Sequence, residues 1–195
     1  MIYYVNEIFL SRQGEGFNQG REVVFIRLAG CNLSCEWCDT EYHTFTEYSA
    51  DKIIKEIKQY NCNSALITGG EPSAQNLSVL LTALKENGYW TAIETNGTIS
   101  LERYKGLIDY ISISPKKQIK QFEASELRIV NDKRTLEEVL EIEKQVHATH
   151  HYISPLEIDG QMNIMDTMIL VDQLNQQSKS QWHISLQLHK LTGIR

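Results

Sequence analysis

The segment VVFIRLAGCNLSCEWC, residues 23–38, joins a short apolar run to three closely spaced cysteines. Its first residues are mostly β-branched, aromatic or aliphatic, which is typical of a buried strand, and the run ends at Gly30. Cys31, Cys35 and Cys38 follow at once in a C-x3-C-x2-C pattern. A fold that contains this segment therefore presents a loop with three thiols directly after a strand of a sheet.

Strands and helices alternate along the rest of the chain. Apolar and β-branched runs predict strands at 23–28, 64–68, 90–94, 110–114, 127–130, 151–153 and 183–186, and apolar residues at helical spacing predict helices at 49–57, 77–87, 135–146 and 165–175. Helical crossovers are the connections that parallel strands need. We therefore predict an α/β fold with a mostly parallel sheet, in a single domain over residues 1–195. Ligands of such sheets bind beyond the carboxyl ends of the strands.

Composition and charge exclude several functional classes. The chain has 195 residues, of which 42% are hydrophobic and 23% charged, as in an ordinary globular domain. The net charge is −6 and no basic patch is present, which argues against nucleic-acid binding. No apolar run is long enough to span a membrane, and the first residues lack the pattern of a signal peptide. We therefore expect a cytoplasmic protein that binds neither nucleic acid nor membrane.

The three clustered cysteines fit two kinds of metal site. An iron–sulfur cluster normally takes four cysteines, so three would leave one iron open to another ligand. A structural zinc site also wants four ligands, and His43 is close enough in sequence to complete a Cys3His set. No second C-x2-C pair follows, which favours the cluster. The fourth cysteine, Cys62, stands alone and is interpreted as a bystander.

The cysteine loop resembles the signature of the radical S-adenosylmethionine (SAM) superfamily, because an aromatic residue, Trp37, directly precedes the third cysteine. The resemblance implies a [4Fe–4S] cluster on Cys31, Cys35 and Cys38, with S-adenosyl-L-methionine on the open iron. It also implies a radical SAM fold, which in a chain this short would be an incomplete, trimmed β/α barrel.

Segments after later strands extend this resemblance. Gly69-Gly70-Glu71-Pro72 is similar to the superfamily's G-G-E-P motif, in which the carboxylate meets the methionine ammonium group. A lysine after the strand at 110–114 could pair with the methionine carboxylate. Many relatives carry Gln-Pro where this chain has Ser154-Pro155, whose serine reaches less far. The implied SAM contacts are Trp37, Cys38, Asp39, Gly69, Gly70, Glu71, Thr95, Ser114, Pro115, Lys116, Ser154 and Pro155.

Four further features look like one family within the superfamily, 7-carboxy-7-deazaguanine synthase. They are SRQGEG at 11–16, Arg27, Asp39-Thr40, and QLHK at 187–190. The resemblance runs from about Glu7 to the C-terminus. It implies a radical-mediated ring contraction of 6-carboxy-5,6,7,8-tetrahydropterin to 7-carboxy-7-deazaguanine, with release of ammonia, in queuosine biosynthesis. It further implies a homodimer and an electron donor such as flavodoxin or ferredoxin.

The residues of these motifs suit a flat heterocycle that carries a carboxylate. Glu15 can accept hydrogen bonds from amino and ring N–H groups, and Arg27 can hold the carboxylate or a ring oxygen. The implied substrate contacts are Arg12, Gln13, Gly14, Glu15, Arg27, Thr68 and His189. The family also binds Mg2+ through a threonine that corresponds to Thr40, whereas one threonine by itself is not a metal motif.

Two alternatives come from other classes. A glycyl-radical enzyme activase shares the cysteine loop, but it removes hydrogen from a glycine of a protein. The polar residues at 13–15, Arg27 and 187–189 suit a polar heterocycle and have no obvious role in that reaction. A zinc-stapled binding module would be a non-enzymatic protein, and it would contain zinc in place of iron.

Overall fold

The computed structural model describes residues 1–38 and 40–194. The strands of its main sheet are β1 Ile2–Arg12, β2 Glu22–Leu28, β3 Thr46–Ser49, β4 Ser64–Gly69, β5 Trp90–Thr95, β6 Tyr110–Ile113, β7 Glu123–Asn131, β8 His147–Pro155 and β11 Trp182–Ile184. A separate hairpin holds β9 Glu157–Ile158 and β10 Gln161–Met162. The helices are α1 Ala50–Ile57, α2 Ser78–Glu86, α3 Leu136–Gln145, α4 Ile164–Gln177 and α5 Leu188–Thr192, with 3-10 turns η1 Pro72–Ala74 and η2 Glu102–Tyr104.

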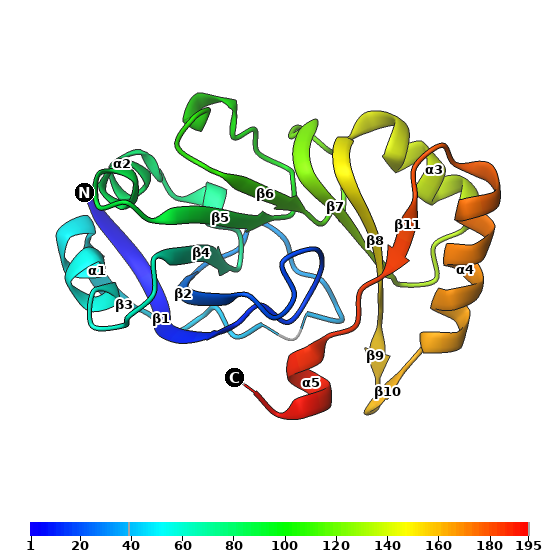
Figure 1. Ribbon diagram of the computed structural model, residues 1–195, viewed down its shortest axis with the longest axis horizontal. Helices are drawn as coiled ribbons and strands as arrows, with labels where there is room; N and C mark the ends of the chain where they lie inside the picture. The colour runs from blue at the N-terminus through cyan, green and yellow to red at the C-terminus, as the bar shows by residue number, and fades with distance from the viewer. Residues whose placement is uncertain (39, 195) are drawn as a thin grey trace.

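The nine strands form one sheet in the order β11-β8-β7-β6-β5-β4-β2-β1-β3 (Figure 1). All neighbours from β2 to β11 are parallel, whereas β1 pairs antiparallel with both β2 and β3. Because β11 and β3 are the two edges, the sheet does not close on itself. The prediction of a mostly parallel, incomplete β/α barrel is confirmed.

Two helix starts follow the capping rules that the sequence suggests. Ser49 caps α1 through a hydrogen bond that its side chain accepts from the backbone N–H of Lys52, at 3.2 Å. Thr135 and Glu138 form a reciprocal capping box at the start of α3. Among the described residues, no helix combines the length and apolarity that crossing a membrane requires.

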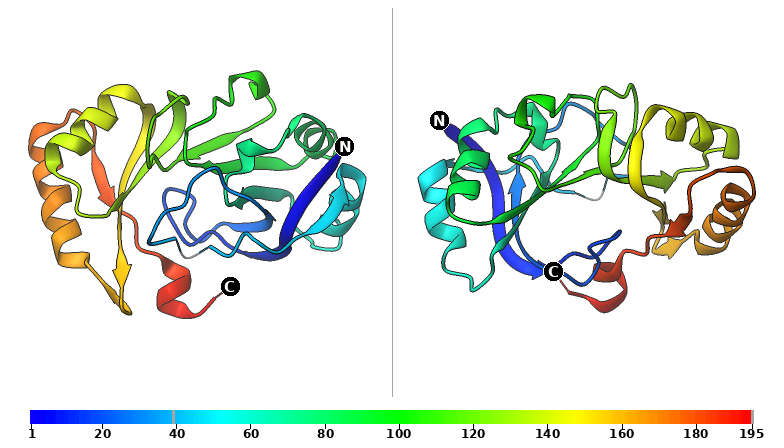
Figure 2. Two further views of the ribbon diagram at one scale, coloured as in Figure 1. Left: turned by 180° about the vertical axis from the view of Figure 1, so that it is seen from behind. Right: turned by 45° about the horizontal axis from the view of Figure 1, so that its top comes forward.

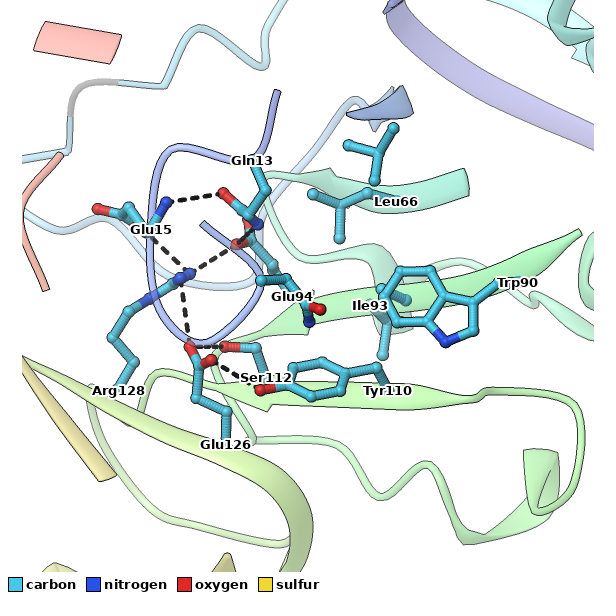
Figure 3. Close-up of a pocket in the computed structure, with 13 residues that line it drawn as sticks. Gln13, Glu15, Leu66, Trp90, Ile93, Glu94, Tyr110, Ser112, Glu126 and Arg128 are labelled. Atoms are coloured by element: carbon cyan, nitrogen blue, oxygen red, sulfur yellow. Dashed lines mark hydrogen bonds and ion pairs between the residues drawn. The ribbon is translucent and has the colours of Figure 1, made fainter. Parts of the chain in front are cut away.

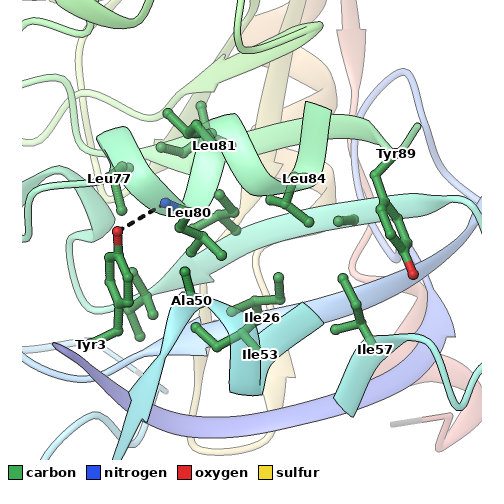
Figure 4. Close-up of a cluster of buried hydrophobic side chains, with 14 of the residues drawn as sticks. Tyr3, Ile26, Ala50, Ile53, Ile57, Leu77, Leu80, Leu81, Leu84 and Tyr89 are labelled. Carbon is green, nitrogen blue, oxygen red and sulfur yellow. Dashed lines mark hydrogen bonds between the residues drawn. The ribbon is translucent and has the colours of Figure 1, made fainter. Parts of the chain in front are cut away.

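The largest core lies between α1, α2 and the strands β1, β2 and β4 (Figure 4). Ile53 and Leu84 are fully buried there, and the hydroxyl of Tyr3 accepts a hydrogen bond from the backbone N–H of Leu80, at 2.9 Å. A second core beneath α3 and α4 centres on Trp182. Both cores pack helices against one face of the sheet. They leave the carboxyl ends of the parallel strands available for a ligand-binding site.

Leu84→Ala is expected to destabilise the protein, because it empties a fully buried position of the first core. Such substitutions cost about 2–5 kcal/mol. In a protein of this size each kcal/mol lowers the midpoint of thermal unfolding by roughly 2–4 °C. The matched control is Val79→Ala on the same helix, where the side chain is 44% exposed, and its midpoint should stay close to that of the wild type. Equal midpoints for both variants would contradict this description of the core.

The structure differs from the sequence-based assignment at both ends of the chain. The sequence does not predict β1, because a bulge between Val5 and Glu7 interrupts the alternation of its buried side chains. The strand at 23–28 is therefore the first parallel strand but the second in the chain. At the other end, residues 188–192 form helix α5, whereas the sequence places 187–190 at the close of the last strand.

Candidate functional site

Two adjoining clefts open at the carboxyl ends of the parallel strands. The cysteine cleft contains the three thiols and has a cavity volume of about 200 Å³. The Arg27 cleft lies beside it and has a cavity volume of about 350 Å³. The residues that line both are Glu15, Thr40, Thr68, Glu94 and Gln187. Molecules bound in the two clefts would therefore lie next to each other.

The cysteine loop begins directly after β2 and is tied to the segment that follows β5. The Asn32 side chain donates to the hydroxyl of Thr98, at 2.8 Å, and accepts from the Asn96 side chain, at 3.0 Å. The three cysteines that line the cleft, Cys31, Cys35 and Cys38, form no disulfide. Three unlinked thiols facing one cleft provide the donor set that a cluster with one open iron requires.

Within residues 1–38 and 40–194, no three His, Cys, Asp or Glu side chains are grouped around a position for a single ion. Cys62 precedes β4, at the opposite end of the sheet from the cysteine loop, and its thiol contacts the backbone carbonyls of Glu22 and Ser64. It contributes nothing to either cleft.

Gly69 and Gly70 connect β4 to the cysteine loop by close backbone packing. Gly69 has a φ of 128°, a conformation that favours glycine, and a Cβ there would collide with the carbonyl of Leu28. A Cβ on Gly70 would collide with the carbonyl of Gly30. The same carbonyl accepts a hydrogen bond from the backbone N–H of Glu71, at 2.9 Å. These glycines therefore bring the two loops together at the edge of the cysteine cleft.

The side chain of Glu71 differs from its expected place. It is fully buried and lines neither cleft. Its carboxylate accepts from the backbone and hydroxyl of Ser73, at 3.0 and 2.5 Å, from the Thr95 hydroxyl, at 2.8 Å, and from the backbone of Asn96, at 2.7 Å. Three of these donors bind Oε1 and one binds Oε2, so Glu71 joins the loops that follow β4 and β5.

The two expected prolines also lie outside the cysteine cleft. Pro115 is buried, and its carbonyl accepts from Arg134 at 3.2 Å. Pro155 lines a smaller adjoining cavity together with Trp37. Asp39, another expected SAM contact, lies outside the described residues.

The other expected SAM contacts line the cysteine cleft: Trp37, Cys38, Gly69, Gly70, Thr95, Ser114, Lys116 and Ser154. The Lys116 ammonium donates to the hydroxyl of Ser114, at 2.6 Å, and lies 4.6 Å from the centre of the Trp37 ring. Burial of this ammonium group lowers the pKa of Lys116 to about 8. The buried hydroxyl of Ser154 has no hydrogen-bond partner among the described residues. The cleft thus offers a cation, an aromatic ring and an unpaired hydroxyl to a ligand.

All seven expected substrate contacts line the Arg27 cleft: Arg12, Gln13, Gly14, Glu15, Arg27, Thr68 and His189. Arg27 forms an ion pair with Glu7, with 2.9 Å between its Nε and the carboxylate, and the bulge in β1 places Glu7 opposite it. The stacked rings of Phe9 and Phe25, 4.9 Å apart, form an aromatic wall. A flat, anionic molecule would find a ring surface and a guanidinium in this cleft.

Helix α5 contributes His189 and Lys190 to the lining of the Arg27 cleft. Figure 2 shows this helix near the loop that follows β1. The backbone N–H of Leu188 donates to the carbonyl of Gly14, at 3.0 Å, and a Cβ on Gly14 would collide with the His189 ring. Lys190 pairs with Glu157 of the β9–β10 hairpin, at 3.2 Å. The C-terminal segment therefore brings His189 to residues that lie some 170 positions earlier in the chain.

The floor of the site contains two residues that the sequence analysis does not name as substrate contacts, Glu94 and Arg128 (Figure 3). Glu94 accepts from Gln13 at 3.0 Å, from Thr68 at 2.9 Å and from Arg128 at 2.6 Å. Burial acts to raise the pKa of Glu94, but the charge of Arg128 and these hydrogen bonds outweigh it and hold that pKa below its usual value. Glu94 lies at the carboxyl end of β5, a position that marks candidate site residues in a parallel sheet. Arg128 lies within β7, so its place in the sequence does not mark it as a site residue.

Comparisons with known proteins agree with this geometry. The model of the Radical SAM superfamily matches residues 25–153. The chain is 44% identical to 7-carboxy-7-deazaguanine synthase of Haemophilus influenzae, over 98% of this chain and 94% of that protein. It is 42% identical to the enzyme of the same name from Neisseria meningitidis, with the same coverage. The crystal structure of QueE from Escherichia coli has a TM-score of 0.73 and 25% identity, and it covers 97% of this chain and 95% of that one.

Proposed function

This chain belongs to the 7-carboxy-7-deazaguanine synthase family of the radical SAM superfamily, and we propose that its two clefts divide the work of that enzyme. The reaction is the ring contraction of 6-carboxy-5,6,7,8-tetrahydropterin to 7-carboxy-7-deazaguanine, with release of ammonia. The cysteine cleft holds the cofactors and the Arg27 cleft holds the pterin. The observation that carries this division is the shared boundary, where Thr40, Thr68 and Glu94 line both clefts.

The donor set of the cysteine cleft fits a [4Fe–4S] cluster and SAM. Cys31, Cys35 and Cys38 would hold the cluster, and the Lys116 ammonium suits the carboxylate of the methionine group. The unpaired hydroxyl of Ser154 offers a further hydrogen bond. When bound, these cofactors supply a radical able to remove a hydrogen atom from the substrate. The protein's part is to orient the two ligands and to exclude water.

The Arg27 cleft supplies groups for each part of the pterin. Among the described residues, the Glu15 carboxylate forms one ion pair, with Arg128, and accepts no hydrogen bond, so most of its acceptor capacity remains for N–H donors of the ring. The Arg27 guanidinium can form a bidentate pair with the substrate carboxylate, while Phe9 and Phe25 cover the flat ring. Gln13 and Thr68 are held by Glu94 at the boundary between the clefts.

Thr40 is the proposed protein ligand of Mg2+, which keeps several waters and needs few protein ligands. Its place on the boundary of both clefts would allow the ion to contact the substrate as well. Magnesium there would orient the substrate carboxylate and stabilise charge during the rearrangement.

Thr40→Ala is expected to raise the Mg2+ concentration that gives half of the maximal rate by about tenfold or more, as for other losses at metal sites. The measurement is a Mg2+ titration of product formation at saturating SAM and pterin. Thr46→Ala, an exposed position on β3 that lines neither cleft, is the control and should titrate as the wild type does. A Thr40→Ala titration that coincides with the control would remove Thr40 from the metal site.

We further propose a homodimer and a one-electron donor such as flavodoxin or ferredoxin. The two alternatives from the sequence analysis are not favoured. A glycyl-radical activase acts on a protein, whereas the relatives over nearly the whole chain are named as 7-carboxy-7-deazaguanine synthases. A zinc-stapled module is not an enzyme and does not account for those relatives.

The test of the proposed function is anaerobic reconstitution with iron and sulfide, followed by turnover with SAM, Mg2+ and 6-carboxy-5,6,7,8-tetrahydropterin. We expect 7-carboxy-7-deazaguanine, ammonia and 5′-deoxyadenosine as products. The absorbance of the cluster is recorded first, so that an empty preparation is not mistaken for an inactive one. An intact cluster without 7-carboxy-7-deazaguanine would reject the assignment.

A further inference from the structure

Arg128 lines the cysteine cleft and lies at the centre of a buried charge network (Figure 3). Its side chain is 7% exposed and contacts three carboxylates: Glu94 at 2.6 Å, Glu15 at 3.2 Å and Glu126 at 3.3 Å. One guanidinium thus faces three acidic groups that come from the loop after β1, from β5 and from β7 itself. Such an excess of buried negative charge is costly unless each carboxylate is stabilised by donors or reserved for a ligand.

The three carboxylates differ in how many donors they receive. Glu126 accepts from the Tyr110 hydroxyl at 2.8 Å, the Ser112 hydroxyl at 2.9 Å and the backbone of Phe17 at 2.9 Å, in addition to Arg128. Its acceptor positions are therefore filled by the protein, and it is only 2% exposed. It serves as the fixed anchor of the network.

Glu15 has the opposite environment. Among the described residues its carboxylate forms one ion pair, with Arg128, and accepts no hydrogen bond, and its side chain is 16% exposed and lines both clefts. Glu94 is intermediate, since donors from Gln13, Thr68 and Arg128 leave it one further acceptor position. The unfilled acceptor positions of the network therefore lie on the carboxylates of Glu15 and Glu94. These two carboxylates are neighbours because both pair with the same nitrogen of Arg128.

The anchor also fixes the loop that carries Glu15. A Cβ on Gly16 would collide with the Glu126 carboxylate, so this loop packs tightly on β7. The backbone N–H of Gly16 donates to the Ser185 hydroxyl, at 2.9 Å, which ties the loop to the segment after β11 as well. Glu126 thus holds both Arg128 and the backbone next to Glu15.

We propose that Arg128, anchored by Glu126, is a positioning residue that holds Glu15 and Glu94 as neighbouring negative acceptors and thereby makes the site selective for a ring with adjacent N–H and amino donors. The inference rests on the proposed function, which places the pterin in this cleft. Arg128 itself need not touch the substrate. It fixes the spacing of the two acceptors, because each is bound to the same guanidinium nitrogen. A lysine at this position lacks the planar fork and cannot hold three carboxylates in one geometry.

The experiment measures equilibrium binding to the reconstituted enzyme with SAM present, by anaerobic calorimetry. The two ligands are 7-carboxy-7-deazaguanine and its analogue without the 2-amino group, so they differ by one donor. We expect the wild type to bind 7-carboxy-7-deazaguanine about 10- to 100-fold more tightly than the analogue, which is the size of effect that a hydrogen bond to a charged partner gives. In Arg128→Lys this preference should fall by about tenfold. Glu126→Gln should lower the preference in the same direction but by less. Arg103→Lys, outside both clefts, is the matched control.

The ratio of the two affinities separates positioning from a general structural role. If Arg128→Lys weakens both ligands equally and keeps the wild-type ratio, Arg128 only supports the fold and the inference is wrong. A wild type that turns over the pterin but binds both ligands equally also overturns the inference, with the proposed function intact. A wild type with an intact cluster and no turnover rejects the proposed function and the inference together.

Discussion

Cys35→Ala is expected to abolish the absorbance of the [4Fe–4S] cluster and, with it, all formation of 5′-deoxyadenosine. Cys35 lines the cysteine cleft together with the two other cysteines of the loop. Removing it leaves two thiolates for a cluster that already lacks a fourth protein ligand. The measurement combines iron and sulfide content with the visible spectrum after anaerobic reconstitution, and we expect both to fall to background.

Cys62→Ala is the matched control, because Cys62 lies at the other end of the sheet and lines neither cleft. Its iron content and spectrum should equal those of the wild type. Thermal unfolding of the apoproteins shows whether either variant alters the fold itself. If Cys35→Ala binds iron and sulfide as the wild type does, the assignment of the cluster ligands is wrong.

Arg27→Lys is expected to raise the KM for the carboxypterin by about 10- to 100-fold, because a bidentate, charged pair is replaced by a single-point contact. Arg27 lines the cleft from β2, and the Glu7 carboxylate lies 2.9 Å from its Nε in an ion pair. That pairing leaves the rest of the fork to meet the carboxylate. Lysine keeps the charge but loses this geometry, so the effect reports recognition and not simple loss of charge.

Two measurements test Arg27→Lys. The first is a full kinetic analysis with the carboxypterin, and the second is the rate of SAM cleavage in the absence of substrate. That background cleavage should be unchanged, since Arg27 does not line the cysteine cleft. Arg21→Lys is the matched control, because Arg21 stacks on Trp90 at 3.5 Å and lines neither cleft. An unaltered KM in Arg27→Lys would show that the substrate carboxylate binds elsewhere.

Local sequence patterns predicted the parts of the molecule that depend on neighbouring residues. The strand at 23–28 and the helices after Ser49 and Thr135 are found close to their predicted bounds, because β-branched runs and capping side chains act over a few residues. The cysteine loop belongs to the same class, since its three thiols lie within eight positions. Where a local pattern is interrupted, as by the bulge in β1, the prediction fails.

Glu71 shows the limit of a motif taken from sequence. The motif correctly marks a glycine loop beside the cysteine loop, but the direction of the carboxylate depends on donors from Thr95 and Asn96, more than twenty positions away. Those donors bury Glu71 behind the cleft. The type of residue at a strand end is readable from sequence, whereas the side to which it turns depends on what packs against it.

The sequence by itself determined the α/β fold, the cysteine loop at the end of a strand, and the polar residues that surround it. Each depends on short-range periodicity or on residues adjacent in the chain. Only the tertiary structure decided that Glu15, Glu94 and Arg128 share one network, because Gln13 and Glu94 are 81 positions apart and Glu94 and Arg128 are 34 apart. It likewise decided that helix α5 covers the Arg27 cleft. The physical reason is that parallel pairing brings the ends of distant strands to one edge of the sheet, where side chains with no sequence relation become neighbours.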